Sequence, residues 1–304
     1  MDNVCHTLVG AALGEAGLKE RTRFGSVTLM VAANLSDIDV LVFATSVPAV
    51  AFRRGWTHGP LALAVLPLLL TGIMTALARA RPAPSGAAPL RAGRLLLLAY
   101  VGMLSHIGLD LLNPYGLRLL APFDWRWFYG DALFIIDPWL WLILGAGIWL
   151  SRRMRTSLPA RHALAVATLY VLAMTANARL ARGIVLEAWR VERGGPPVAL
   201  MVGPVPITPF RREIIVDAGI DYETGMLDWL GARVTFDPTV VFKHDTDPRV
   251  ARAREAPNIR AFLVWARFPY FTFEPVPGGT RVTVSDLRFA GRTPARFSES
   301  TVVP

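Results

Sequence analysis

The sequence has little charge and almost no cysteine. Charged residues make up 18% of the 304 positions, hydrophobic residues make up 53%, and the mean hydropathy is +0.40. This balance is too apolar for an ordinary soluble protein of this length. The single cysteine, Cys5, excludes an intramolecular disulfide framework. The opening residues, MDNVCHTLVG, lack the basic region of a signal peptide, so we expect the first apolar segment to be retained.

Long apolar runs dominate the first 180 residues. The run 61–78 contains no charged side chain and approaches the roughly 20 residues that cross a hydrocarbon core. Five further apolar segments lie at about 4–18, 24–43, 95–112, 132–150 and 162–180. We therefore predict an α-helical integral membrane bundle of about six helices over residues 1–182.

Basic clusters separate pairs of these predicted crossings. The positive-inside rule places the segments 19–23, 79–94 and 152–161 in the cytoplasm. The N-terminus, the loops at about 38–60 and 113–131, and everything after the sixth crossing then face outward. Because topology explains the formal net charge of +9, we expect no nucleic-acid partner.

The composition changes after about residue 183. Segments rich in β-branched and aromatic residues predict strands: REIIVDAG, ARVTFDP, FPYFTFEPV and TRVTVSDLRFA. The intervening PVPGGT predicts a hairpin turn between the last two. The stretch 247–268 has helical spacing broken by Pro257, which predicts two short helices. We predict a small α+β, mostly antiparallel, extracytoplasmic domain over residues 183–304.

The informative residues are polar side chains within or beside apolar segments, because an aspartate at the centre of a spanning helix costs about 2.5 to 3.5 kcal/mol. They are His6, Asp37, Asp39, His58, His106 and Asp110, with Asp131 and Asp137 as weaker members. His106 and Asp110 are four residues apart, so a helix places both side chains on one face. That spacing suits two ligands of one metal ion; the alternative is a buried histidine that bonds an aspartate for packing alone.

The predicted topology brings all six stronger candidates toward the outer side of the membrane. Asp37 and Asp39 would repel each other there unless a cation compensates their charges. Residues two apart on a regular helix point to different sides, so we expect the helix to end near Ser36 and both carboxylates to turn inward. The sequence therefore predicts one shared metal site near the external leaflet.

Five ordered motifs carry a family resemblance. MDNVCHTLVG, ANLSDIDVL, RRGWTH, SHIGLDLLNPYG and LFIIDPWLW, over about residues 1–180, resemble the bacterial membrane-bound metal-dependent hydrolases, inner-membrane proteins also described as LexA-binding. The C-terminal domain resembles an extension carried by one branch of that family. The order of the motifs is in turn similar to part of the ligand series of zinc-dependent phospholipase C.

The resemblance implies a ligand set: His6, Asp37 or Asp39, His58, His106 and Asp110. Arg53 stands where many family members have a histidine. The later histidines that complete a three-metal phospholipase centre have no counterpart, which implies one ion or two.

Hydrolysis is the chemistry that such a site predicts. Histidine and carboxylate ligands fit zinc, which we expect, as well as manganese or iron. Whichever of Asp37, Asp39 and Asp110 is not a ligand is expected to act as general base or to orient a ligand. Arg53 or Arg54 is expected to hold an anionic group such as phosphate, with contact to lipid headgroups as the alternative.

The expected substrate is a phosphoester or a lipid-linked molecule, because a site at the outer bilayer surface meets membrane lipid first. The alternative function is a non-catalytic membrane anchor, a regulatory protein or a metal carrier.

Overall fold

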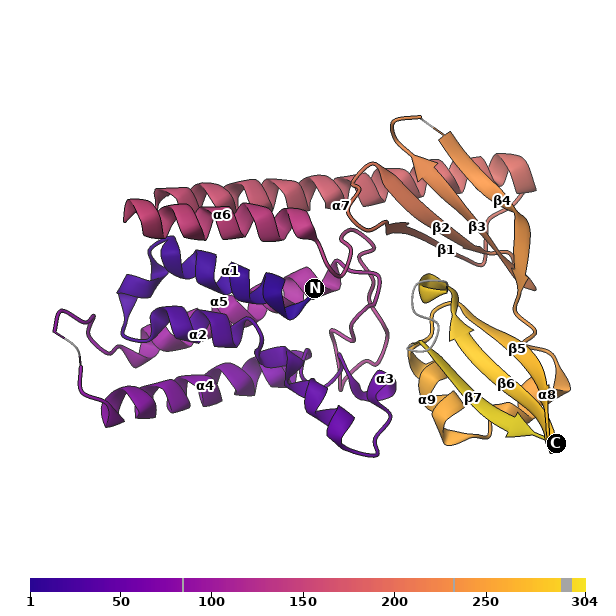
Figure 1. Cartoon of the computed structure of the whole chain (residues 1–304), viewed down its shortest axis with the longest axis horizontal. Helices are drawn as coiled ribbons and strands as arrows, with labels where there is room; N and C mark the ends of the chain where they lie inside the picture. The colour runs from indigo at the N-terminus through magenta and orange to yellow at the C-terminus, as the bar shows by residue number, and fades with distance from the viewer. Residues whose placement is uncertain (84, 232, 291–296) are drawn as a thin grey trace. The chain divides into compact units, whose positions relative to one another are not determined.

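The computed structural model describes residues 1–83, 85–231, 233–290 and 297–304. The chain divides into two compact units (Figure 1). Unit 1 comprises Met1–Val40 and Arg54–Asn177, and unit 2 comprises Leu41–Arg53 and Ala178–Pro304. The predicted helical N-terminal region and the predicted antiparallel sheets that follow it are both confirmed.

Unit 1 is built from helices. They are α1 (Asn3–Glu15), η1 (Leu18–Arg21), α2 (Gly25–Ala32), η2 (Leu35–Ala44, which continues into unit 2), α4 (Pro60–Ala80), α5 (Ala92–Leu111), α6 (Pro138–Met154) and the first part of α7 (Leu158–Arg193), where η marks a 3-10 helix. Side-chain caps fix two starts, because Asp2 accepts hydrogen bonds from the first amides of α1 and Asp137 from those of α6. Capping therefore explains the polarity of Asp137.

Three helices among the described residues are long and apolar enough to cross a membrane: α4, α5 and α7. The pair α2 and η2 qualifies only jointly and is bent by 52°, so the number of spans is three or four. The predicted count of six is not confirmed. At 1.5 Å per residue, the 13 residues of α1 reach only about 20 Å, short of the roughly 30 Å hydrocarbon core.

Apolar side chains on the candidate spans point away from the helical core. Leu69 of α4 is 56% exposed and Leu169 of α7 is 66% exposed. Exposing such leucines to water costs free energy, whereas exposing them to lipid does not. Unit 1 is therefore an apolar body suited to a bilayer, as its composition predicts.

The basic clusters lie together at one end of unit 1. The guanidinium group of Arg23 donates to the carbonyls of Ala78, Arg81 and Pro82, which ties the segment before α2 to the end of α4. Arg161 donates to the carbonyl of Ala16 in the same way. Figure 1 shows these connections at the end of unit 1 opposite the N-terminus. The assignment of that end to the cytoplasm remains a prediction.

Two antiparallel sheets form most of unit 2 (Figure 1). The first has the order β1 (Ala199–Pro204), β2 (Arg211–Asp217), β3 (Asp221–Asp228), β4 (Arg233–Phe242), and the second has the order β5 (Pro269–Val276), β6 (Gly279–Asp286), β7 (Ser298–Val303). The remaining elements of the unit are α3 (Ala49–Phe52), α8 (Pro248–Ala253), α9 (Pro257–Trp265) and η3 (Leu287–Phe289). The predicted hairpin joins β5 to β6, and Pro257 separates two short helices as expected.

The last turns of α7 belong to the core of unit 2. Ala181, Val185 and Trp189 pack against buried residues of the first sheet, including Leu200 and Ile214. The predicted domain boundary at 182/183 falls inside α7, which runs without a break to Arg193. Because α7 is one continuous helix that contributes both to a candidate span and to the core of the first sheet, its helical periodicity gives no signal of the domain boundary.

A buried ion pair between Asp286 and Arg288 lies at the end of β6. Asp286 accepts hydrogen bonds from the Arg288 side chain, at 2.9 and 2.8 Å, and from the backbone amides of Arg267, Phe268 and Arg288. Burial alone would raise the pKa of Asp286, but the charge of Arg288 and these hydrogen bonds outweigh it and lower the pKa. The guanidinium also lies over the ring of Trp265.

Replacing Asp286 by asparagine is expected to destabilise unit 2 by about 3 to 5 kcal/mol, because Arg288 then becomes an uncompensated buried charge. Asp228→Asn is the matched control: its partner Arg211 is exposed, so we expect a loss below about 1 kcal/mol. Since the pKa of Asp286 is lowered by folding, its stabilisation is full above the unfolded value of about 3.9 and is lost as the pH falls through the folded pKa. Denaturant unfolding of both variants as a function of pH measures this; equal midpoints for the two would contradict it.

Candidate metal centre

Helix α5 supplies two adjacent polar side chains. His106 and Asp110 are fully buried, and His106 Nε2 lies 3.4 Å from Asp110 Oδ2. The one-turn spacing predicted from the sequence is therefore confirmed. Both side chains face the interior of unit 1.

A break between α2 and η2 positions Asp37. The helix was expected to end near Ser36, but α2 ends at Ala32 and a 3-10 helix begins at Leu35. The reason lies in Asn34, whose side-chain amide donates to the Met30 carbonyl at 2.9 Å and so takes the acceptor that its own backbone amide would use in an α-helix. Asp37 and Asp39 follow this break, and both are buried.

Close packing at Gly102 brings the end of α2, and with it the break before η2, against α5. A Cβ atom added at Gly102 would lie 2.8 Å from the carbonyl oxygen of Leu29 and 2.7 Å from the Cβ of Ala32. The Ala33 carbonyl oxygen is consequently 2.8 Å from His106 Nδ1. The absence of a side chain at Gly102 thus sets the distance between α2 and the ligand helix.

The turn before α4 brings in His58. Its Nε2 lies 3.3 Å from His106 Nε2 and 3.6 Å from Asp110 Oδ2. Gly59 permits this turn, because a Cβ there would overlap the carbonyl oxygen of Ala121. His58 is fully buried, so its role is not that of an interfacial side chain.

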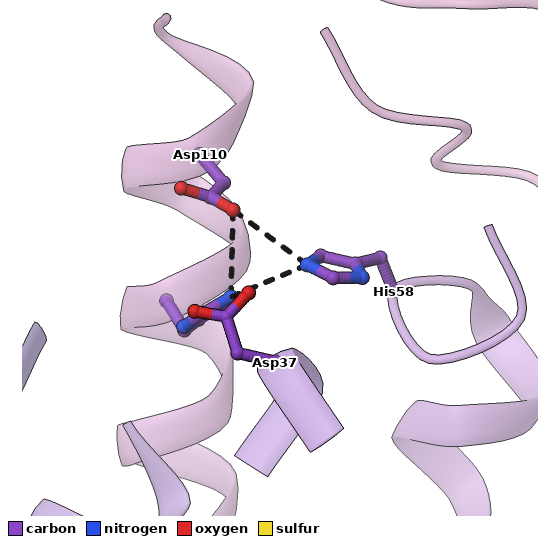
Figure 2. Close-up of side chains that lie close together, drawn as sticks. Asp37, His58 and Asp110 are labelled. Carbon is purple, nitrogen blue, oxygen red and sulfur yellow. Dashed lines mark hydrogen bonds and ion pairs between the residues drawn. The ribbon is translucent and has the colours of Figure 1, made fainter. Parts of the chain in front are cut away.

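Four side chains therefore converge: Asp37, His58, His106 and Asp110. Figure 2 shows Asp37, His58 and Asp110 pointing toward one another. Each offers a ligand atom, and these atoms all lie within 4.8 Å of one another. Their donor set, two imidazole nitrogens and two carboxylate oxygens, is that of a zinc, manganese or iron site. All four are buried, so the group forms one enclosed centre that can hold a metal ion.

The hydrogen bonds around the two imidazoles fix where their protons are. The carbonyl of Ala33 can only accept, so His106 donates from Nδ1. The Thr57 hydroxyl gives its proton to Asp39 Oδ2, at 3.1 Å, and therefore accepts from His58 Nδ1 at 2.9 Å. When both rings are neutral, each presents an Nε2 lone pair, and the two Nε2 atoms lie 3.3 Å apart. A cation between them removes this repulsion, which is the fit that a metal ion requires.

Asp39 lies outside the group of four. It accepts hydrogen bonds from the backbone amide of Arg54, at 2.8 Å, and from Thr57 Oγ1, and its Oδ2 is 3.7 Å from His58 Nδ1. It is thus placed to hold the turn that carries His58 and to orient that ring. Of the two aspartates that the sequence offered as ligands, Asp39 thus lies where the expected orienting residue would be, and Asp37 lies with the group of four.

His6 lies beside the four residues. Its Nε2 is 3.3 Å from Asp110 Oδ1, and its ring stacks on that of His106 with centroids 3.9 Å apart. Its Nδ1 is buried without a hydrogen bond among the described residues. The α-amino group of Met1 also contacts Asp110 Oδ1. The predicted ligand His6 is therefore adjacent to the centre, on the opposite carboxylate oxygen of Asp110.

The two arginines of RRGWTH differ in position. Arg54 is buried, its Nη2 lies 3.2 Å from Asp110 Oδ2, and its guanidinium lies over the ring of Tyr115. Its Nε is a buried donor without a hydrogen bond among the described residues. Arg53 belongs to unit 2, where it lies over the ring of Phe43. Only Arg54 is therefore in the centre.

Two asparagines that contact residues of the centre were not predicted from the sequence. Asn3 donates to Asp37 Oδ2 at 3.1 Å, and Asn113 accepts from Arg54 at 3.2 Å while its own amide lies 3.4 Å from Asp110 Oδ1. Asn113 follows Asp110 by three residues, so helical spacing was an available signal. No sequence signal pointed to Asn3, because its partner Asp37 is 34 residues away along the chain.

A family model for the YdjM inner membrane proteins matches residues 1–180. The chain belongs to this family. The matched region contains every residue of the metal centre, and the sheets of unit 2 lie beyond it. YdjM membership and the candidate spans support a protein of the inner membrane. No curated protein and no solved structure matches the chain.

Proposed function

We propose that this protein is a metal-dependent hydrolase of the membrane, with one divalent ion, zinc first, held by Asp37, His58, His106 and Asp110. The observation that supports it is the pair of opposed Nε2 lone pairs, with tautomers fixed by Ala33 and Thr57, beside two carboxylates. Arg54 compensates part of the carboxylate charge, and a cation between the two Nε2 atoms would relieve their repulsion.

A divalent cation held there would polarise a substrate oxygen and lower the pKa of a water molecule. The chain's own residues divide the remaining tasks. Asn3 holds Asp37 through Oδ2, which leaves Oδ1 toward His106. Asp39 orients His58 through Thr57, which is the supporting role that metal-ligating histidines require.

Arg54 is the residue proposed to bind the substrate's anionic group. Its Nη2 is engaged by Asp110, whereas its buried Nε is the donor that a phosphoryl oxygen would pair with. A phosphoester, free or lipid-linked, is therefore the proposed substrate class. In the predicted topology the centre faces the outer leaflet.

The test is hydrolysis by the purified full chain in nanodiscs with added zinc or manganese. Probes are a phosphodiester, a phosphomonoester and an acyl ester, each also on a short-chain lipid. We expect one bond type to be cleaved and Asp37→Asn to lower kcat/KM by at least about 100-fold. Asp124→Asn is the matched control, since that loop carboxylate pairs with the exposed Arg126, and we expect its rate within about twofold of the parent.

Metal binding without cleavage of any probe would overturn the hydrolase and favour the carrier or the regulatory anchor. Cleavage that Asp37→Asn leaves intact would overturn the assigned centre.

A further inference from the structure

A groove of about 500 Å³ opens beside the metal centre, lined by α1 and by the break between α2 and η2. Its residues are Asn3, Thr7, Met30, Val31, Asn34, Leu35, Asp37, Ile38 and Val40. Asp37 is thus shared by the groove and the candidate metal centre. The volume falls in the range that holds the polar head of a small ligand.

A line of polar side chains runs along the groove to Asp37. The amide of Asn34 donates to Thr7 Oγ1 at 3.0 Å, and Asn3 donates to Asp37 Oδ2. Both amide protons of Asn34 are used, on Thr7 and on the Met30 carbonyl. Its Oδ1 is buried with no hydrogen bond among the described residues. A buried acceptor of this kind is unfavourable until a donor pairs with it.

The rim of the groove is apolar and exposed. Val31, Ile38 and Val40 are 40%, 45% and 48% exposed, on the bent pair α2 and η2 that qualifies jointly as a candidate span. Acyl chains would be stabilised by contact with these side chains, whereas a wholly polar ligand would not. The rim therefore favours a ligand that arrives from the bilayer.

The Oδ1 acceptor of Asn34, unpaired among the described residues, indicates which chemical group the polar head of that ligand carries. Its Oδ1 needs a donor, and either a hydroxyl or an ammonium group supplies one. An ammonium group would be repelled by the cation proposed at Asp37 and by Arg54, so a neutral hydroxyl is the better partner. No basic residue lines the groove among the described residues, so it does not select by negative charge.

We infer that this groove is the lateral binding site of a lipid whose head carries hydroxyl groups, with the head against Asn34 and the scissile bond beside Asp37. As a substrate site it rests on the proposed function. As a lipid site it stands on the groove alone.

Photocrosslinking in nanodiscs tests the inference. Val31→benzoylphenylalanine captures lipid at the rim, and Leu169→benzoylphenylalanine on α7 is the matched control at an exposed position outside the groove. The nanodiscs contain equal amounts of phosphatidylglycerol and phosphatidylmethanol, which carry the same charge and differ in the head hydroxyls. Mass spectrometry gives the ratio of the two lipids in the adduct.

We expect phosphatidylglycerol to be enriched about fivefold at position 31, the ratio that one hydrogen bond of ordinary strength gives, and not at position 169. Asn34→Leu should return the ratio at position 31 to about one. Equal ratios at both positions in the parent protein would overturn the inference, whether or not the Asn34 variant folds.

Hydrolysis of the probes is measured on the same samples, so the experiment tests the lipid groove and the hydrolase independently. Enrichment without cleavage of any probe would keep the groove and overturn the hydrolase. Cleavage without enrichment would keep the hydrolase and overturn the groove.

Discussion

Replacing His106 by alanine is expected to lower the metal affinity of the purified protein by at least about 100-fold. The change removes one of four ligand atoms and the ring on which His6 stacks. Loss of a residue that merely orients a ligand already costs about 10- to 100-fold, so loss of a ligand costs no less. Inductively coupled plasma mass spectrometry of the protein, together with competition against a chelator of known affinity, measures the difference.

His162→Ala is the matched control for this experiment. His162 is an exposed histidine of α7 and is not part of the group of four, so its removal should leave the metal content unchanged. Equal metal content in the parent, the His106 variant and the His162 variant would contradict the centre. Loss of metal in both variants would point to a site elsewhere.

Replacing Gly102 by alanine is expected to weaken metal binding about 10- to 100-fold without touching a ligand. The new methyl group would meet the Leu29 carbonyl and Ala32 at less than 3 Å, so α2 must move away from α5. That movement stretches the hydrogen bond between Ala33 and His106 Nδ1 and shifts the segment that carries Asp37. We also expect a loss of about 1 to 3 kcal/mol in stability, as for overpacked cores.

Gly108→Ala on the same helix provides the control for the glycine change itself. A Cβ at Gly108 meets no atom within 4 Å. We expect it to stabilise α5 by about 0.5 to 1 kcal/mol, through the lost backbone freedom of the unfolded chain, with metal affinity unchanged. Thermal unfolding and metal titration of the two variants decide the matter, and indistinguishable affinities would show that the α2–α5 contact does not set the centre.

Spacing along one helix was the part of the centre that the sequence predicted best. His106 and Asp110 share a turn of α5, and helical geometry alone brings them together. His58 was predicted through the topology of the predicted crossings, and its burial against His106 agrees with that reasoning. The cost of polar groups within or beside apolar segments singled out all four members as candidates, along with His6 and Asp39.

The roles within the cluster were harder to predict. Asp37 and Asp39 look alike in the sequence, but the side chain of Asn34 ends α2 early and leaves only Asp37 facing the ligand helix. Asp39 is engaged by the Arg54 amide and Thr57, contacts that depend on a turn closed by long-range packing. The lengths of α1 and α6 were likewise overestimated, since apolar runs continue into caps and loops that composition does not distinguish from helix.

The fixed tautomers have a consequence for proton transfer. His58 and His106 each give their one N–H to the surrounding chain, to Thr57 and to Ala33. With both Nε2 atoms turned to a cation, neither ring has a proton to hand to a departing alcohol. If the proposed hydrolysis takes place here, the proton for a leaving group would come from a donor other than these two rings.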